Sequence, residues 1–217
     1  MSERLVVIDY GSGNLRSAEK ALVRAARDGG LDCTVVVSDA PDALDAASRI
    51  VLPGVGAFAD CMRGLANVPG LAASLADNVL RRGKPFLGIC VGMQLLADRG
   101  LEHGAARGLG WIAGEVVPIE TGDPRLKVPH MGWNELTIGR AHPVLDGLGG
   151  EGMTHAYFVH SYRFDCRDPQ VELAATVHGI PITAVIGRDN IVGTQFHPEK
   201  SQRTGLKLLE NFIRWRP

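Results

Sequence analysis

The amino-acid sequence predicts an α/β protein with a doubly wound, mostly parallel sheet that continues into a mixed or antiparallel edge. The first half of the 217 residues alternates short apolar runs with stretches of helical periodicity, and glycines mark the junctions. This alternation is typical of βαβ units. The second half carries short β-type runs separated by Gly, Pro and Asp turns, which indicates antiparallel strands.

The elements of the first half follow from their apolar patterns. Continuous apolar runs predict strands buried on both faces, at residues 5–8, 34–37, 50–52 and 85–89. Apolar side chains at helical spacing predict helices over residues 15–26, 71–79 and 91–97. The first two helices are expected to end at glycines, at Gly29–Gly30 and near Gly83.

The second half predicts mainly strands. Six short runs are expected to form them, at residues 115–119, 134–138, 156–160, 172–177, 183–186 and 191–196. Helical spacing returns only in the last segment, through Leu206, Leu209, Phe212 and Ile213. The sequence shows no repeat and no linker, so we expect one domain over residues 1–217.

The composition excludes several classes of function. Hydrophobic residues make up 45% of the chain and charged residues 22%, and the formal net charge is -1 without a basic block. We therefore expect no nucleic-acid partner and no membrane partner. The N-terminus is too quickly polar for a signal peptide, and no apolar run approaches the roughly 18–20 residues of a membrane span. A soluble, cytoplasmic protein is expected.

The sequence also predicts no metal and no cofactor. The four cysteines form no C-x-x-C pair, and no metal-binding histidine motif occurs. Gly11 and Gly13 lack the third glycine of a dinucleotide-binding fingerprint, because Arg16 stands in its place.

Cys90 is the candidate nucleophile. It lies in G-I-C-V-G at residues 88–92, between a predicted strand and a predicted helix. This spacing is typical of a nucleophile elbow, in which the glycines permit a sharp turn. The N-terminus of the helix favours the thiolate form of the sulfur. The sequence therefore predicts a cysteine hydrolase.

A candidate base and its orienting group lie downstream, in F-H-P-E at residues 196–199. On an extended segment His197 and Glu199 point to the same side. Glu199 can then hold the imidazole in one tautomer while His197 exchanges protons with Cys90. An H-P-E tripeptide alone is more often a surface turn, but beside the elbow the catalytic interpretation is favoured.

A glycine-rich turn supplies candidate oxyanion donors. The predicted strand at 50–52 runs into P-G-V-G at residues 53–56, and acyl transfer needs backbone N–H groups aimed at the developing negative charge. We expect one donor from the amide of Val91 and another from the amide of Val55 or Gly56. P-G-x-G alone is a weak signal, since glycines are common in turns.

Three motifs together resemble those of class I (triad-type) glutamine amidotransferases. They are P-G-V-G-A-F at residues 53–58, P-F-L-G-I-C-V-G-M-Q-L-L at 85–96 and Q-F-H-P-E-K-S at 195–201. The resemblance implies the amidotransferase fold and its reaction. Cys90 would attack the side-chain amide of glutamine, ammonia would leave, and water would hydrolyse the γ-glutamyl thioester.

Three further stretches resemble the glutaminase subunits of imidazole glycerol phosphate synthases. They are I-D-Y-G-S-G-N-L at residues 8–15, P-H-M-G-W-N at 129–134 and Y-F-V-H-S-Y at 157–162. This resemblance implies a heterodimer with a (β/α)8-barrel cyclase subunit. The cyclase would use the ammonia to make imidazole glycerol phosphate and an aminoimidazole carboxamide ribonucleotide, a step of histidine biosynthesis.

The resemblance also implies roles for individual residues. Cys90 matches the nucleophile, His197 the base and Glu199 the orienting carboxylate. Positions that match the glutamine site are Gly56, Gln94, His160, Ser161 and Tyr162. Positions that match the contact with the cyclase are Asn14, Pro129, Met131, Trp133, Tyr157 and Lys200. Met131 and Trp133 lie between proline and glycine residues, so we expect them on an exposed loop.

Other interpretations stay open. The chain could serve a different synthase, such as one for anthranilate, formylglycinamidine or pyridoxal phosphate. It could also be a catalytically silent interaction protein, or a cysteine peptidase or esterase on a related sheet. A glutaminase acting alone would waste glutamine, so we further hypothesise that the turn at 53–56 is poorly disposed at rest and shifts when the cyclase binds its ligand.

Overall fold

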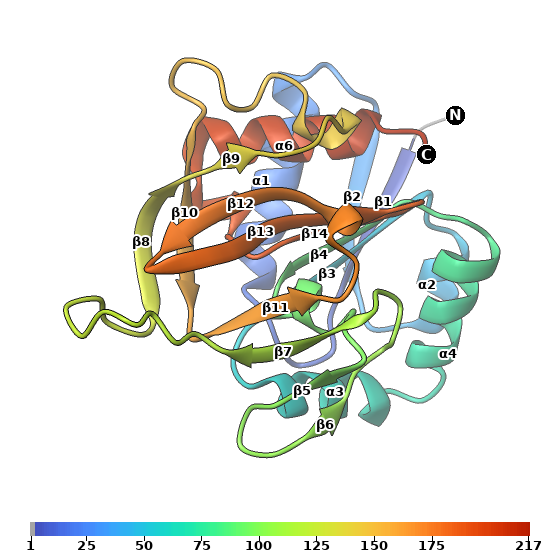
Figure 1. The fold of residues 1–217 in the computed structure, drawn as a ribbon. Helices are drawn as coiled ribbons and strands as arrows, with labels where there is room; N and C mark the ends of the chain where they lie inside the picture. The colour runs from blue at the N-terminus through green and yellow to red at the C-terminus, as the bar shows by residue number, and fades with distance from the viewer. Residues whose placement is uncertain (1–2) are drawn as a thin grey trace.

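The computed structural model describes residues 3–217 and has a central sheet of eight strands with helices on both sides (Figure 1). The strand order is β2-β1-β3-β4-β14-β13-β12-β9. Neighbours from β2 to β14 are parallel, and β13, β12 and β9 continue the sheet in antiparallel fashion. The predicted fold class, a mostly parallel sheet with an antiparallel edge, is confirmed.

The strands of the central sheet have clear bounds. They are β1 (Glu3–Ile8), β2 (Cys33–Ser38), β3 (Arg49–Gly54), β4 (Phe86–Cys90), β9 (Thr137–Ile138), β12 (Glu172–His178), β13 (Ile180–Arg188) and β14 (Ile191–Thr194). A four-stranded sheet has the order β11-β7-β5-β6, and β10 pairs with β8. These strands are β5 (Arg99–Gly100), β6 (Ala106–Arg107), β7 (Gly114–Pro118), β8 (His130–Glu135), β10 (His155–His160) and β11 (Tyr162–Cys166).

The helices form a layer on each side of the central sheet. They are α1 (Leu15–Asp28), α2 (Pro41–Asp45), α3 (Phe58–Asn67), α4 (Leu71–Ala76), α5 (Val91–Gln94) and α6 (Gln202–Arg214). A π-helical turn at Asp77–Arg81 continues α4. Helices α1 and α6 lie together on one side, and α2, α3 and α4 lie on the other (Figure 1). Because both faces are covered, the central strands read as continuous apolar runs.

Several elements differ from the sequence-based expectation. Residues 58–67 form α3, which the sequence analysis does not include, although its buried residues Phe58, Cys61 and Leu65 have helical spacing. Helix α5 ends at Gln94 instead of reaching residue 97. The strand expected at 134–138 is two strands, β8 and β9, which pair with β10 and β12. The division into β8 and β9 arises from tertiary pairing, which local patterns do not record.

Parallel pairing brings three distant segments to one edge of the sheet. Gly54 at the end of β3 lies opposite Cys90 at the end of β4. Thr194 at the end of β14 lies opposite Ile89. Since parallel strands share their carboxyl-terminal edge, the segments that follow β3, β4 and β14 meet there, where α/β sheets bind ligands.

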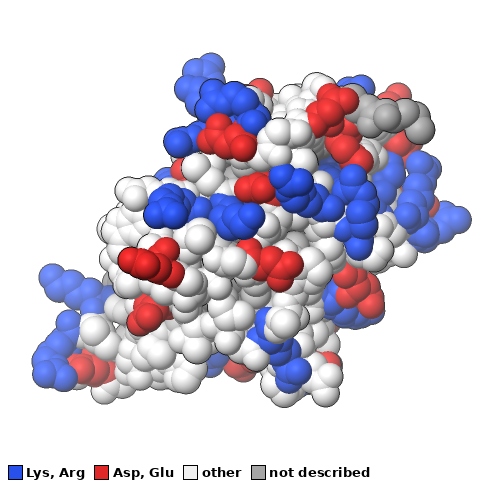
Figure 2. Space-filling model, turned by 90° about the horizontal axis from the view of Figure 1, so that it is seen from above, with Lys and Arg blue, Asp and Glu red and all other residues white. Residues whose placement is uncertain are grey.

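Charged side chains of both signs are interspersed on the face above α1 and α6 (Figure 2). Arg24 and Arg27 pair with Asp28, and Arg214 pairs with Glu210. Exposed pairs of this kind contribute little to stability. Within residues 3–217, no helix is long and apolar enough to cross a membrane, and no group of three His, Cys, Asp or Glu side chains could hold a metal ion.

The backbone contact between β3 and the start of α5 generates the first prediction. A Cβ atom at Gly92 would clash with the carbonyl oxygen of Leu52 on β3. Backbone cannot move away as a flexible side chain can, so Gly92→Ala is expected to lower the free energy of unfolding by at least roughly 1–3 kcal/mol. Urea denaturation should show a lower midpoint.

Gly139→Ala is the matched control for this measurement. A Cβ atom at Gly139 would meet only the carbonyl oxygen of Leu173, at an ordinary 3.7 Å. Its urea midpoint should stay close to that of the original chain. Equal midpoints for the two variants would contradict the close contact at Gly92.

Candidate active site

Cys90 lies in a sharp turn between β4 and α5. Its own backbone has a φ of +56°, a conformation that is strained for a residue with a side chain and that occurs at functional sites. The sequence analysis expects the neighbouring glycines to make the sharp turn, but the unusual backbone angle lies at Cys90 itself. A Cβ atom at Gly88 would lie 2.5 Å from the carbonyl oxygen of Gly92, so the glycines permit close backbone contact while Cys90 itself adopts the unusual angle.

His197 and Glu199 are hydrogen-bonded to each other. The distance from Nδ1 of His197 to Oε1 of Glu199 is 2.8 Å, and each side chain is only 3% exposed. The expectation that they share one side of an extended strand is wrong, because β14 ends at Thr194 and Pro198–Lys200 form a 3₁₀ turn. The turn brings the carboxylate of Glu199 back to the imidazole of His197, so the expected pair forms by a different route.

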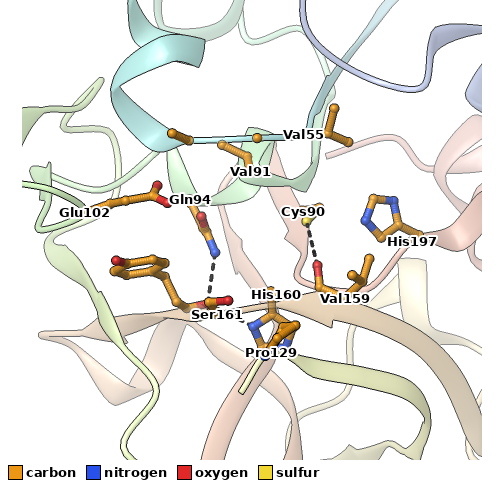
Figure 3. Close-up of a pocket in the computed structure, with 13 residues that line it drawn as sticks. Val55, Cys90, Val91, Gln94, Glu102, Pro129, Val159, His160, Ser161 and His197 are labelled. Carbon is orange, nitrogen blue, oxygen red and sulfur yellow. Dashed lines mark hydrogen bonds between the residues drawn. The ribbon is translucent and has the colours of Figure 1, made fainter. Parts of the chain in front are cut away.

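The surroundings of His197 favour its protonated form. Burial alone would lower the pKa of His197, but hydrogen bonds and charge interactions with Cys90 and Glu199 outweigh burial and raise this pKa to about 10. His197 lies beside Cys90 in the cavity (Figure 3). A protonated imidazole next to the sulfur favours the thiolate, which is the nucleophilic form of cysteine. The geometry is therefore suited to nucleophilic attack followed by proton transfer.

Two buried glutamines extend the polar contacts of Cys90. Nε2 of Gln195 donates to Sγ of Cys90 at 3.7 Å, and Oε1 of Gln195 accepts from Nε2 of Gln94 at 3.0 Å. Nε2 of Gln94 also donates to the carbonyl oxygen of Tyr162 at 3.1 Å. Gln195 precedes the F-H-P-E motif, but nothing in the sequence indicates that it reaches the sulfur.

A cavity of about 470 Å³ opens beside Cys90 (Figure 3), a size typical of small-molecule sites. Its lining comes from six separate parts of the chain: Val55, Gly56, Ala57, Cys90, Val91, Gln94, Glu102, Pro129, Val159, His160, Ser161, Tyr162 and His197. Every residue that the sequence assigns to the glutamine site or the oxyanion hole is in this set. Pro129, which the sequence assigns to the partner contact, also lines the cavity.

Glu102 is a lining residue that the sequence does not indicate. It lies between β5 and β6, and its Oε2 accepts a hydrogen bond of 2.7 Å from the backbone N–H of Phe58 at the start of α3. It is the only acidic side chain among the described residues that line the cavity. No motif surrounds Glu102, so only the tertiary structure reveals it.

The glycine-rich turn after β3 is tied to the loop after β1. The backbone N–H of Val55 donates to Oγ of Ser12 at 3.4 Å, and this hydroxyl donates to the carbonyl oxygen of Val55 at 2.6 Å. Gly56 follows with a φ of +89°. Val91 begins α5, where backbone N–H groups have no partner within the helix. Of the candidate oxyanion donors, the amide of Val55 thus already has a hydrogen-bond acceptor in Ser12.

Most residues that the sequence assigns to a partner contact are gathered on one surface. The rings of Trp133 and Tyr157 meet edge to face at 6.0 Å, and Nζ of Lys200 lies 5.7 Å from the centre of the Tyr157 ring. Met131 and Trp133 are 61% and 49% exposed. The expectation of a loop is wrong here, because both residues lie on β8, which pairs with β10.

Asn14 is the remaining residue that the sequence assigns to the partner contact. It is exposed and immediately precedes α1. Ser17, in the first turn of α1, lines the same groove as Lys200. The loop before α1 and the turn after His197 therefore lie on neighbouring parts of the surface.

The fold and the cysteine site together define a class of enzyme. A family model described as glutamine amidotransferase class-I matches residues 6–215. The chain belongs to the class I glutamine amidotransferase family, as the sequence motifs predict.

Its curated relatives carry a narrower name. The chain is 58% identical to the imidazole glycerol phosphate synthase subunit HisH of Rhodospirillum rubrum, over 99% of this chain and 100% of that protein. It is 56% identical to the subunit of the same name from Cereibacter sphaeroides, over 98% and 99% of the two chains. The predicted resemblance to the glutaminase subunits of these synthases is confirmed.

Solved structures support the same fold. A crystal structure of a glutamine amidotransferase matches with a TM-score of 0.68 at 17% identity, over 96% of this chain and 97% of that one. A glutamine amidotransferase from Thermotoga maritima matches with a TM-score of 0.62 at 17% identity, over 99% and 84%. At this identity the likeness concerns the fold alone.

The contacts of His197 generate the second prediction. Its folded-state pKa, about 10, lies above the ordinary value of 6.5. The stability that this shift contributes is therefore fully present below about pH 6.5 and is lost as the pH rises through about 10. In an NMR titration the His197 ring should remain protonated at pH 8. Cys90→Ala and Glu199→Gln should each move its midpoint to lower pH.

Glu120→Gln serves as the control for this titration, because Glu120 is exposed and does not line the cavity. It should leave the His197 midpoint unchanged. A midpoint near 6.5 in the unmodified chain would show that the contacts of His197 do not stabilise the imidazolium.

Proposed function

We propose that this chain is the glutaminase subunit of an imidazole glycerol phosphate synthase and that residues 1–217 form a single amidotransferase domain. It hydrolyses glutamine to glutamate and ammonia and passes the ammonia to a (β/α)8-barrel cyclase subunit. The observation that carries the proposal is the buried contact of His197 with Glu199 beside Cys90, in a chain similar to HisH subunits over its full length. We expect the heterodimer to act in the cytoplasm.

The reaction begins with Cys90. Its thiolate attacks the side-chain carbonyl carbon of glutamine, and the oxygen takes up the negative charge near the amide of Val91. His197 gives its proton to the departing nitrogen, so ammonia leaves and a γ-glutamyl thioester remains. Neutral His197 then removes a proton from water, which attacks the thioester. The thiolate is released, and the γ-carboxyl group of glutamate loses its proton to solvent.

The cavity also offers groups for the amino-acid end of glutamine. Glutamine carries an α-ammonium group, and the carboxylate of Glu102 is its natural complement in the lining. Gln94, Ser161 and Tyr162 line the same cavity and would complete the hydrogen bonding. We assign the substrate contacts to these residues together with Gly56 and His160.

The second oxyanion donor is proposed to be conditional. Because the amide of Val55 donates to Ser12, it is not free to bind an oxyanion in this conformation. Reorientation of the turn, which contains Gly56, would release the amide of Val55 or present that of Gly56. The loss of one oxyanion donor typically slows such a reaction by roughly 10²–10³. This supports the hypothesis that ligand binding in the cyclase switches the glutaminase on.

The exposed surface of Trp133, Tyr157 and Lys200, together with Met131, is proposed to contact the cyclase. Exposed aromatic and methionine side chains of this kind are enriched in protein–protein interfaces. Asn14 and Pro129 would lie at the margin of the contact. Ammonia released at Cys90 would then leave toward the partner.

The third prediction tests the whole proposal. Glutamate release is measured for this chain alone and with the cyclase subunit, each with and without the ribonucleotide ligand. We expect very low turnover alone and strong turnover in the complete mixture, because the oxyanion site is completed only there. Cys90→Ala should abolish turnover under every condition.

Other outcomes would separate the alternatives. Full activity of the chain alone would argue against the conditional oxyanion donor and would reopen the choice of synthase. No activity under any condition, with the chain folded and Cys90 unmodified by a glutamine-analogue electrophile, would favour a silent interaction protein.

The fourth prediction concerns Glu102. Glu102→Gln keeps the shape of the side chain but removes the charge that would pair with the α-ammonium group. We expect KM for glutamine to rise roughly ten- to hundredfold, as loss of a charged hydrogen bond implies, while kcat changes little. The exposed carboxylate of Glu120 offers a matched control, since Glu120→Gln should leave both constants unchanged. An unchanged KM for Glu102→Gln would remove Glu102 from the glutamine site.

A further inference from the structure

A continuous chain of hydrogen bonds joins the cavity to the partner-facing strand β8. The carbonyl oxygen of Tyr162, bound by Gln94 on one side, accepts from Nδ1 of His160 at 2.8 Å on the other. Nε2 of His160 lies 2.9 Å from Nδ1 of His130. Nε2 of His130 lies 3.0 Å from Nδ2 of Asn134. His160 lines the glutamine cavity, whereas His130 has no role in the reaction described above.

The direction of every bond in this chain is determined at its two ends. Asn134 is held in one orientation, because its Oδ1 accepts from the backbone N–H of Glu135 at 2.8 Å and its Nδ2 donates to the carbonyl oxygen of Val177 at 2.9 Å. Its Nδ2 must therefore donate to His130, and Nε2 of His130 must be without a proton. At the other end, a carbonyl oxygen can only accept, so Nδ1 of His160 carries a proton.

Only one protonation state satisfies both ends. His130 carries its single proton on Nδ1 and donates it to Nε2 of His160, so both imidazoles are neutral Nδ1–H tautomers. An extra proton on either ring would set two donors against each other. Both histidines are also buried, with exposures of 4% and 6%, and burial opposes a charged ring.

The surroundings of the pair agree with this assignment. The rings of His178 and Phe158 both stack on the ring of His130, with centres 4.4 Å and 4.7 Å away. His178 and His197 are the titratable groups whose charges act on His160. Burial, with His160 and His178 nearby, lowers the pKa of His130 to about 3, and burial lowers the pKa of His160 to about 4.

We propose that His130 and His160 are positioning residues, which hold the carbonyl of Tyr162 in place for glutamine binding. They do so through hydrogen bonds of fixed direction that begin at Asn134 on β8. The inference rests on the proposed function, because it gives the Ser161–Tyr162 segment its role in binding glutamine. Asn134 lies on the same strand as the exposed Met131 and Trp133. A partner bound to β8 is therefore connected to the wall of the glutamine cavity by three hydrogen bonds.

Asn134→Asp tests the direction of the chain. An aspartate can only accept, so it requires a proton on Nε2 of His130, and the two rings can then satisfy all their bonds only by taking up one extra proton. At low pH this proton is available and the chain is complete. At high pH it is lost and one bond between the rings is broken. The loss of one hydrogen bond corresponds to roughly a tenfold change in KM for glutamine.

The fifth prediction follows from this behaviour in the assembled two-subunit enzyme. The ratio of KM for glutamine between Asn134→Asp and the original enzyme should rise about tenfold from pH 6 to pH 9, with a smaller effect on kcat. Thr137→Asp adds the same charge at an exposed position three residues away, and its ratio should not vary with pH. A ratio for Asn134→Asp that is independent of pH would overturn the positioning role.

A measurement that needs no activity tests the tautomers directly. Two-bond ¹H–¹⁵N NMR spectra of the unmodified chain should show two neutral histidines protonated at Nδ1, unchanged down to about pH 5. Protonation at Nε2, or titration of both rings near pH 6.5, would overturn the inference. If the assembled enzyme instead failed to hydrolyse glutamine at all, the proposed function would fail, and these spectra would still decide the state of the two histidines.

Discussion

The site depends on the close approach of two backbones, that of β3 and that of the turn between β4 and α5. Gly92 lies against the carbonyl oxygen of Leu52, where no side chain fits. Next to this contact the chain turns sharply at Cys90, which adopts a positive φ. The sulfur is thereby placed at the start of α5 and at the edge of the sheet, where the segments after β3 and β14 also arrive. The other features of the site are arranged around that turn.

The polar groups around Cys90 share a single organisation, although they come from distant parts of the chain. On one side His197 and Glu199 stabilise positive charge next to the sulfur. On the other, Gln195, Gln94 and the carbonyl of Tyr162 form a chain of neutral hydrogen bonds. A buried polar network is stable only when its members are satisfied. The hydrogen bonds that connect Cys90 to the Tyr162 carbonyl are therefore made by neutral groups, and the positive charge lies beside the sulfur, on His197.

Two connections lead from this site toward the surface that we assign to a partner. The first passes from the turn at Val55 to Ser12, on the loop that leads to Asn14 and α1. The second passes through the histidine pair to Asn134 on β8. The first ends at a backbone amide that could stabilise an oxyanion, and the second ends at the wall of the cavity. A partner that contacted both could act on chemistry and on substrate binding separately.

The sequence by itself determined the fold class and the family and singled out Cys90, His197 and Glu199 as the candidate catalytic residues, because these features lie in local motifs and apolar runs. It did not indicate Glu102 or the contacts of Ser12 and Gln195, and it did not show that Met131 and Trp133 lie on a strand. Those features arise where separate segments meet: β8 is a strand only because β10 pairs with it. Contacts between distant segments have no local pattern, so only the tertiary structure decided them.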